Sequence, residues 1–278
     1  MTEKIIVSLT TWSKRIGNIP AVLDTILAQS IKPDLIVLNL AFNEQIPKSI
    51  QAYIDKNGIE IYRVADTKVY KKLIPTLKRY PNDIIINIDD DWLYPSDMIA
   101  DFIDIHNKYP NNPISGNGLV YSEMICHCGC ASLTKADFFE QYIDSIDDDV
   151  IKNCPCSDIV YTYFANKAGH PYITTKNEYF TNMTPFNEEI GYSTTDVKEN
   201  SLKDSLSFLI QKYGIIPQYT NGYVNDPYIA DILYHIHSDE KKETRNNSIA
   251  EIRSTHAYKT GRLLLKPLSM IRHILSKD

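Results

Sequence analysis

The first ninety residues alternate between short apolar runs and segments with helical spacing, and this alternation limits the fold more than any other feature. The strand-like runs are 4–10, 34–40, 59–64 and 83–88, and the helix-like segments are 18–30, 47–56 and 70–80. Runs that are apolar along their whole length are typical of strands covered on both faces. The pattern therefore predicts an α/β fold whose mainly parallel central sheet is flanked by helices. In such a sheet, ligands bind at the edge formed by the strand carboxyl ends.

After about residue 110 the alternation is less regular. We expect strand structure over 114–125, interrupted at Gly116 and Gly118, and helices over 157–167 and 202–213. The polar segment 185–200 is predicted to be a loop.

Charge is distributed unevenly along the chain. The net charge is −6, but residues 241–278 hold nine Lys or Arg and three Asp or Glu, a net of +6, which leaves −12 for residues 1–240. An acidic chain is a poor candidate for general nucleic-acid binding, so we expect no nucleic-acid partner. The segment 258–275 mixes apolar and basic residues at near-helical spacing, which favours contact with an anionic membrane surface. The alternative is a terminal helix packed on the domain.

The start of the chain leads directly into a strand-like run without a secretory pattern, and no apolar run reaches membrane-spanning length. We expect a cytoplasmic location, including the inner face of the plasma membrane. The five cysteines lie in two clusters, Cys126/Cys128/Cys130 and Cys154/Cys156. Reduced thiols are expected there; a zinc site or a disulfide between the clusters stays open as an alternative.

Three consecutive carboxylates, Asp89, Asp90 and Asp91, follow the apolar run 83–88. Strand geometry would place Asp89 and Asp91 on one side and Asp90 opposite. Carboxylates this close repel one another, and a divalent cation such as Mg²⁺ or Mn²⁺ would relieve the repulsion. The alternatives are a solvated turn or a cap for a helix that begins near Ser96.

With this acidic run after a central strand, and with the opening Val7-Ser8-Leu9-Thr10-Thr11-Trp12-Ser13-Lys14-Arg15, the chain resembles GT-A-type nucleotide-sugar glycosyltransferases, in particular the bacterial ones that build surface polysaccharides. The resemblance covers roughly residues 4–175. It implies that Asp91 binds the metal and that Asp89 contacts the ribose or the donor sugar. The further residues that it places at the donor are Asp90, Thr10, Thr11 and Arg15.

The resemblance implies a metal-dependent glycosyltransferase that moves a sugar from a nucleoside-diphosphate sugar to a glycan or lipid-linked acceptor. The donor that it favours is a UDP-sugar. Residues 1–240 would form the catalytic domain, with 1–110 as the donor half and 111–240 as the acceptor half, followed by the basic tail 241–278. Lys71 and Lys72 are candidates for a cation beside the donor diphosphate. Their alternative interpretation is an exposed helix face.

On the acceptor side, the resemblance makes Asp158 the candidate general base. Many members of the family have an acidic residue immediately before this position, whereas this chain has Ser157. The alternative is that Ser157 or Asp158 only caps the following helix. His237, two residues after His235, is a candidate metal ligand by the same resemblance, and the alternative is an ordinary half-buried histidine. Gly129 would lie close to the acceptor.

Two other functional classes stay open from the sequence. A nucleotidyltransferase also combines aspartates with a metal on an α/β sheet, although no glycine-rich pyrophosphate loop is evident near residues 8–18. A non-catalytic module that binds nucleotide sugars or sugars is the second.

Overall fold

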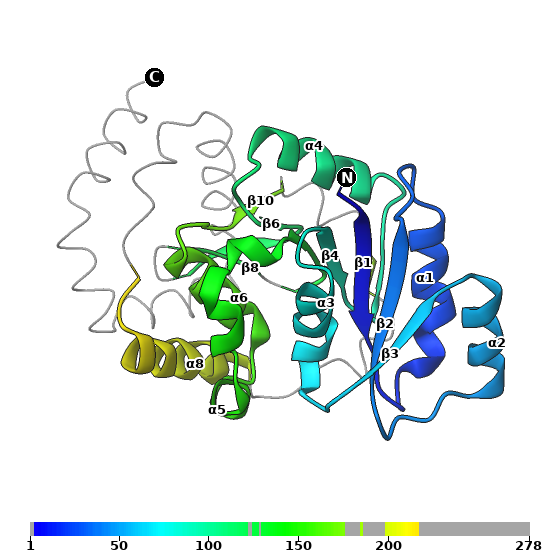
Figure 1. Cartoon of the computed structure of the whole chain (residues 1–278), viewed down its shortest axis with the longest axis horizontal. Helices are drawn as coiled ribbons and strands as arrows, with labels where there is room; N and C mark the ends of the chain where they lie inside the picture. Colours follow the sequence, from blue (N-terminus) through cyan, green and yellow to red (C-terminus); the bar gives the residue numbers. More distant parts are fainter. Residues whose placement is uncertain (1–2, 122–123, 128, 176–183, 186–197, 217–278) are drawn as a thin grey trace, which may run out of the picture.

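The computed structural model describes residues 3–121, 124–127, 129–175, 184–185 and 198–216 (Figure 1). Within these residues, seven strands form the central sheet. From one edge to the other, the order is β10 (Ile173–Thr174), β6 (Ile114–Ser115), β9 (Ala131–Thr134), β4 (Ile84–Ile88), β1 (Ile5–Thr10), β2 (Leu35–Ala41) and β3 (Glu60–Val64). His235, His237 and the basic tail 241–278 lie outside the described residues.

The sheet is mixed but mostly parallel. β1 pairs in parallel with both β2 and β4, and β2 pairs in parallel with β3. β9 runs antiparallel to its two neighbours, β4 and β6. The predicted α/β architecture is therefore confirmed, and the antiparallel strand is an addition that the sequence pattern did not indicate. Since β1, β2 and β4 are parallel, their carboxyl ends meet at one edge.

Helices cover both faces of the sheet because the apolar residues of each central strand alternate between two cores. In β4, Ile84, Ile86 and Ile88 belong to one core and Ile85 to the other. The first core packs under α1 (Ile19–Leu27), α2 (Lys48–Lys56) and α4 (Met98–Lys108). The second packs under the 3₁₀ helix η2 (Lys68–Lys72), α3 (Ile74–Arg79), α5 (Asp148–Asn153), α6 (Ser157–Lys167) and α8 (Lys198–Tyr213).

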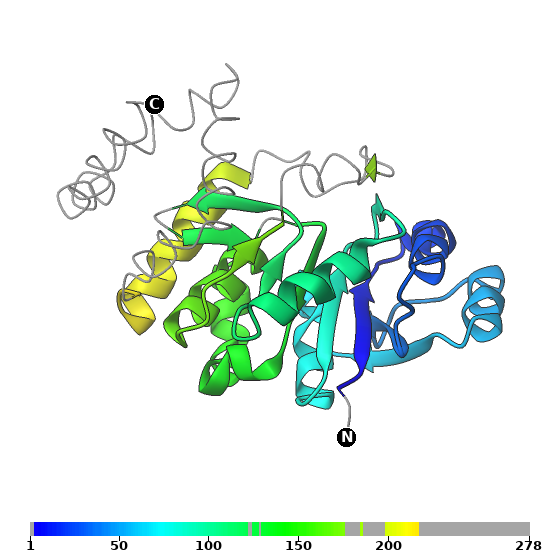
Figure 2. The same cartoon turned by 90° about the horizontal axis from the view of Figure 1, so that it is seen from above.

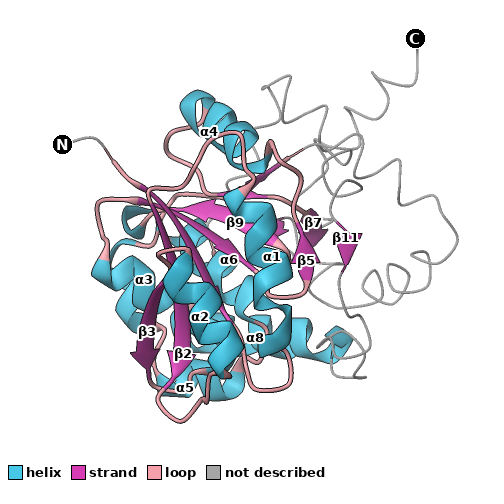
Figure 3. Ribbon diagram, turned by 90° about the vertical axis from the view of Figure 1, so that its right-hand side faces the viewer, coloured by secondary structure: helices cyan, strands magenta, loops and turns pink. Residues whose placement is uncertain are grey.

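The figures show these layers from three directions. In Figure 1, α1 and α2 lie on the opposite side of strands β1–β3 from α3 and α6. Figure 2 separates the blue helices α1 and α2 from the green and yellow helices α5, α6 and α8. In Figure 3, α1 and α2 lie on the near side of the strands. The remaining described elements are the 3₁₀ helices η1 (Ile16–Asn18), η3 (Ala136–Phe138) and η4 (Glu140–Ser145) and four short strands.

The periodicity predicted a single helix over 70–80, and this prediction is wrong. The segment consists of η2 and α3, separated at Leu73. A continuous α-helix would need the backbone N–H of Pro75 to bond the carbonyl of Lys71, and proline has no N–H. Pro75 is instead the second residue of α3, a position that tolerates it. The break places Lys72 at the end of η2.

The segment 114–125 divides at its glycines. β6 ends at Ser115, and the chain then forms an antiparallel pair of β7 (Gly118–Tyr121) and β8 (Met124–His127) outside the main sheet. Another small pair joins β5 (Trp92–Leu93) to β11 (Thr184–Pro185).

The loop predicted over 185–200 is wrong at its end, because α8 begins at Lys198. No helix among the described residues combines the length and hydropathy needed to cross a bilayer.

Candidate functional site

The acidic triplet forms a turn at the carboxyl end of β4. The strand ends at Ile88, and β5 begins at Trp92. The backbone N–H of Asp89 contacts the carbonyl of Cys130 at 3.0 Å, and the hydroxyl of Tyr94 donates to the same carbonyl at 2.7 Å. These bonds fasten the turn to the start of β9. The interpretation of the triplet as a helix cap is wrong, since α4 begins at Met98 with Asp97 as its first flanking residue.

Asp90 and Asp91 are both bound by Arg15. The guanidinium contacts Asp90 Oδ1 at 2.7 Å and Asp91 Oδ2 at 2.5 Å, and Thr11 donates to Asp90 Oδ2 at 2.5 Å. The side chain of Asp90 is only 2% exposed. Asp89 and Asp91 are 24% and 20% exposed, so exposure alternates along the triplet as expected, with Asp90 buried between its partly exposed neighbours.

Burial determines the protonation of this part of the site. Burial raises the pKa of Asp90 to about 7, although Arg15 and Thr11 oppose the rise. Burial and the neighbouring charge of Asp89 also raise the pKa of Asp91. Thr10, the last residue of β1, donates instead to the carbonyl of Asn39 at 2.8 Å. It therefore contacts β2 rather than the triplet.

Lys72 connects the triplet to α6. Its Nζ lies 2.8 Å from Asp89 Oδ1 and 3.8 Å from Asp158 Oδ1, and its side chain is 6% exposed. The two carboxylates outweigh burial and raise the pKa of Lys72 above its usual value, so the ammonium stays charged. The alternative of an exposed helix face is wrong for both lysines, because Lys71 is also buried and pairs with Asp66.

Asp158, the second residue of α6, points into the site rather than capping its helix. The backbone N–H of Gly129 donates to Asp158 Oδ2 at 2.9 Å, and Ser157 lies 3.3 Å from Oδ1. Because α6 has no capping bond from a side chain, the capping alternative is wrong. Burial alone would raise the pKa of Asp158, but Lys72, His127 and the Gly129 N–H hold it below its ordinary value. The carboxylate is therefore ionised at neutral pH.

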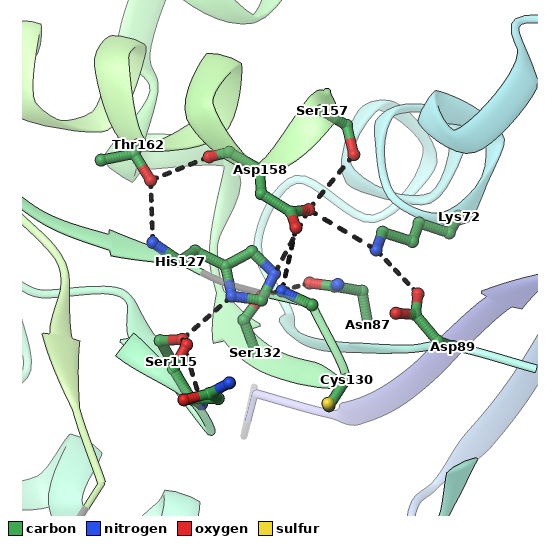
Figure 4. A network of polar contacts seen from close by, with 12 residues as sticks. Lys72, Asn87, Asp89, Ser115, His127, Cys130, Ser132, Ser157, Asp158 and Thr162 are labelled. Carbon is green, nitrogen blue, oxygen red and sulfur yellow. Dashed lines mark hydrogen bonds and ion pairs between the residues drawn. The ribbon is translucent and has the colours of Figure 1, made fainter. Parts of the chain in front are cut away.

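Two residues contact Asp158 in a way that the sequence did not indicate, although Gly129 was expected to lie close to the acceptor. His127, on β8, is fully buried, and its Nε2 lies 3.9 Å from Asp158 Oδ1. Gly129 has a φ of +65°, in the left-handed region that glycine tolerates, and this conformation aims its N–H at Asp158. Figure 4 shows Lys72 and His127 approaching Asp158 from different elements. The segment 126–130, Cys-His-Cys-Gly-Cys, resembles a metal-binding motif, so its histidine was considered only in that context. Its contact with Asp158 depends on the fold.

The carboxylates at the carboxyl edge of the sheet suit a divalent cation in their charge and in their oxygen ligands. Four carboxylates, Asp89, Asp90, Asp91 and Asp158, face two cations, Arg15 and Lys72. The side chains of Asp89 and Asp91 are 24% and 20% exposed, so an ion can approach them. Carboxylate oxygens suit Mg²⁺ and Mn²⁺. Within the described residues, no group of three or more His, Cys, Asp or Glu is arranged as a preformed metal site.

Of the described cysteines, Cys130 and Cys154 are free thiols. Cys126, Cys130 and Cys154 are buried, and Cys156 is half-buried. Cys128 lies outside the described residues.

Comparisons with known proteins bear on the fold. No protein-family model matches the sequence, and no curated protein matches it significantly. Among solved structures, the chain is similar to the mannosyltransferase PcManGT from Pyrobaculum calidifontis, solved in complex with GDP-Man and Mn²⁺. The TM-score is 0.54 at 13% identity, over 100% of this chain and 89% of that chain.

Two further similarities are lower. A 4-diphosphocytidyl-2C-methyl-D-erythritol synthase gives a TM-score of 0.44 at 12% identity, over 69% of this chain and 97% of that one. Glucosyl-3-phosphoglycerate synthase from Mycobacterium tuberculosis, in complex with Mn²⁺, UDP-Glc and phosphoglyceric acid, gives 0.33 at 14% identity, over 41% and 43%. On the first similarity, the chain has a GT-A-like α/β fold with a mixed, mostly parallel sheet flanked by helices.

Proposed function

We propose that this chain is a metal-dependent glycosyltransferase that moves a sugar from a nucleoside-diphosphate sugar to a hydroxyl of a glycan or lipid-linked acceptor. The observation that carries the proposal is the position of Lys72, whose buried ammonium lies between Asp89 and Asp158. These are the two carboxylates that the family resemblance assigns to the donor side and the acceptor side. A site that joins the two sides suits transfer between two substrates. The fold shared with a mannosyltransferase supports the same proposal.

On the donor side, the acidic triplet would repel the anionic diphosphate of the donor unless cations lie between them. Asp91 would hold the metal, and Asp89 would contact the ribose or the donor sugar. Both are partly exposed members of the triplet, so both can reach the donor. When bound, the ion would act as a Lewis acid toward the leaving diphosphate. Arg15 binds Asp91 and Lys72 binds Asp89, so both cations lie where they can also contact the diphosphate. The buried carboxylate of Asp90 would hold the guanidinium of Arg15 in place beside the donor.

On the acceptor side, Asp158 would take the proton of the attacking hydroxyl. A general base must be unprotonated before the reaction, and the lowered pKa of Asp158 meets this requirement at neutral pH. The N–H of Gly129 and the ammonium of Lys72 orient the carboxylate. A transfer with this base would invert the configuration of the anomeric carbon.

Other parts of the proposal rest on the sequence. UDP is the proposed nucleotide, and Thr10 and Thr11 are proposed to lie near it. Residues 1–110 and 111–240 are proposed as the donor and acceptor halves. The basic segment 241–278 is proposed to hold the enzyme at the inner face of the plasma membrane beside a lipid-linked acceptor. His237 is proposed as a further metal ligand.

The experiment that tests the metal role is the substitution Asp91→Ala, with Asp104→Ala as the control. Asp104 is an exposed aspartate of α4 and makes no part of the site. We expect Asp91→Ala to lose Mn²⁺ binding in calorimetry and to lose donor turnover while its circular dichroism spectrum is unchanged. Asp104→Ala should retain both activities. Full turnover by Asp91→Ala, or by the wild-type protein in excess chelator, would refute the metal role.

A further inference from the structure

The ring of His127 has one nitrogen whose role the site described so far does not explain. Nε2 is buried, makes no hydrogen bond in the part of the chain that the structure describes, and faces Asp158 Oδ1 at 3.9 Å. Buried polar atoms are normally paired, so one without a partner beside a carboxylate calls for a reason. Which tautomer the ring adopts decides what Nε2 can do.

The hydrogen bonds of Ser115 determine the tautomer. Its hydroxyl donates to the carbonyl of Asn117 at 2.5 Å, and its oxygen accepts the backbone N–H of Asn117 at 3.2 Å. A hydroxyl has one proton, and here it is committed to Asn117. The 3.0 Å contact between Ser115 Oγ and His127 Nδ1 must therefore be donated by the ring. A neutral ring with the proton on Nδ1 presents an unprotonated Nε2 to Asp158.

The ring is held in this orientation. It stacks on Tyr172 with centroids 5.6 Å apart and an interplanar angle of 10°. The backbone N–H of His127 donates to Thr162 Oγ1 at 3.0 Å, and Thr162 donates to the carbonyl of Asp158 at 2.8 Å. Figure 4 shows Thr162 joining the two residues. Turning Nε2 away from the carboxylate would break the contact of Nδ1 with Ser115 or the stacking on Tyr172.

We propose that His127 is a positioning residue that accepts, through Nε2, the proton that Asp158 removes from the acceptor hydroxyl. This inference rests on the proposed function. The O–H bond of the acceptor breaks as an O–H bond forms on Asp158, and the acceptor oxygen uses the freed electron pair to bond the sugar. The nucleoside diphosphate leaves with the electron pair of the bond that breaks. The proton then moves to Nε2, which leaves an imidazolium paired with the Asp158 carboxylate, and it returns through Asp158 to water after product release.

The surroundings keep the ring neutral before the reaction. The charged groups that face it are Asp158 from α6, Lys72 from η2 and Asp89 from the turn after β4. Burial lowers the pKa of His127 below its ordinary value, Lys72 lowers it further, and the two aspartates oppose this. Tyr172 stays neutral because burial raises its pKa. A proton arriving on Asp158 would thus find a neutral, unprotonated nitrogen beside it.

The first test measures the tautomer directly and does not depend on turnover. Two-bond ¹H–¹⁵N correlation spectra of the full chain, labelled with ¹⁵N-histidine, separate protonated from unprotonated ring nitrogens. The signals of His127 are assigned by their loss in His127→Gln. We expect Nδ1 protonated and Nε2 unprotonated at pH 7.5, and a change of this pattern in Ser115→Ala. A proton on Nε2 in the wild-type protein would overturn the proposal, because the ring would then only donate to Asp158.

The second test is the pH dependence of kcat. In the wild-type protein, the acid limb should follow protonation of the ring, since an imidazolium cannot accept a proton. In His127→Gln, we expect kcat to fall about tenfold to a hundredfold and the acid limb to move to lower pH, where Asp158 alone titrates. The matched control is His106→Gln. His106 is also a buried histidine with an unpaired nitrogen among the described residues, but it lies on α4, and its substitution should leave the limb unchanged.

The outcomes separate this inference from the proposed function. A uniform fall in kcat with an unmoved limb would show a structural role for His127 and overturn the inference, even if Asp158→Asn is inactive. A limb displaced to higher pH would show that the ring donates to Asp158, which also overturns it. If the wild-type chain turns over no donor sugar, the proposed function fails, and the proton transfer fails with it whatever the tautomer.

Discussion

Removing the ammonium of Lys72 should destabilise the protein more than removing the ammonium of its neighbour Lys71. Both lysines are buried, and both side chains are 6% exposed. In Lys72→Met the carboxylates of Asp89 and Asp158 lose a shared cation. In Lys71→Met only Asp66 loses its partner, and Asp66 is 45% exposed, so water can replace the lysine.

The distances give the size of the effect. At 3.8 Å, the attraction between Lys72 Nζ and Asp158 Oδ1 is about 4 kcal/mol at an effective dielectric constant of 20, and about 1 kcal/mol in bulk water. The side chain of Asp158 is 19% exposed, which places the pair nearer the first value. Removing one partner of a buried pair costs about 3–5 kcal/mol when no water reaches the other. We expect Lys72→Met to lose about 2–4 kcal/mol of unfolding free energy and Lys71→Met about 1 kcal/mol or less.

The loss should also depend on pH in a defined direction. The pKa of Asp158 is lowered in the folded state, so the pair stabilises the fold above the ordinary pKa of an aspartate and is lost as the pH falls through the folded value. The pKa of Lys72 is raised, so its charge is complete at neutral pH. In Lys72→Met, burial without the ammonium raises the pKa of Asp158, so its carboxylate takes up a proton at a higher pH than in the wild-type protein. The difference between the wild-type protein and Lys72→Met should therefore be full at pH 7 and shrink toward pH 4.

Urea unfolding followed by circular dichroism at pH 7 and pH 4 measures these differences. Equal losses of stability in Lys72→Met and Lys71→Met at pH 7 would contradict the role of Lys72 as a shared cation. A loss in Lys72→Met that does not decrease in acid would contradict it as well.

Two further predictions concern the aspartates. Asp158→Asn should lower kcat by about two to four orders of magnitude with an unchanged circular dichroism spectrum, and a variant that keeps a tenth of wild-type turnover would remove Asp158 as the base. Because burial raises the pKa of Asp90 to about 7, the folded state binds an extra proton between its ordinary pKa and pH 7, so this residue makes stability decline as the pH rises through that window. In Asp90→Asn this component should disappear from urea unfolding measured at pH 5 and pH 8, and identical pH dependence in the two proteins would contradict the assignment.

The fold was largely predictable because its central strands are apolar on both faces. The runs 34–40 and 83–88 correspond to β2 and β4 within a residue at each end, and α6 has the bounds predicted for it. The antiparallel strand β9 was not predicted. It is four residues long, and its sequence Ala-Ser-Leu-Thr has neither a long apolar run nor clear alternation. Its place in the sheet comes from pairing with β4 and β6, which are distant in the sequence.

The site was predictable residue by residue but not in its contacts. The sequence indicated Asp89, Lys72 and Asp158 separately, and only the fold shows that one ammonium contacts both carboxylates. The alternating exposure of the acidic triplet was expected, but the contact of one guanidinium, that of Arg15, with both Asp90 and Asp91 is visible only in the fold. His127 was missed as a partner of Asp158, because the two are 31 positions apart in the sequence and the contact arises from the packing of β8 on α6.

The most direct test of glycosyl transfer is a screen of nucleotide sugars with the purified full chain, in Mn²⁺, in Mg²⁺ and in excess chelator, with the released nucleotide identified by chromatography. We expect turnover of at least one nucleoside-diphosphate sugar that requires the metal and releases free nucleoside diphosphate. Release of pyrophosphate from a nucleoside triphosphate and a sugar phosphate would instead identify a nucleotidyltransferase. Tight binding of a nucleotide sugar without turnover in any of these conditions would identify a binding module and contradict the account.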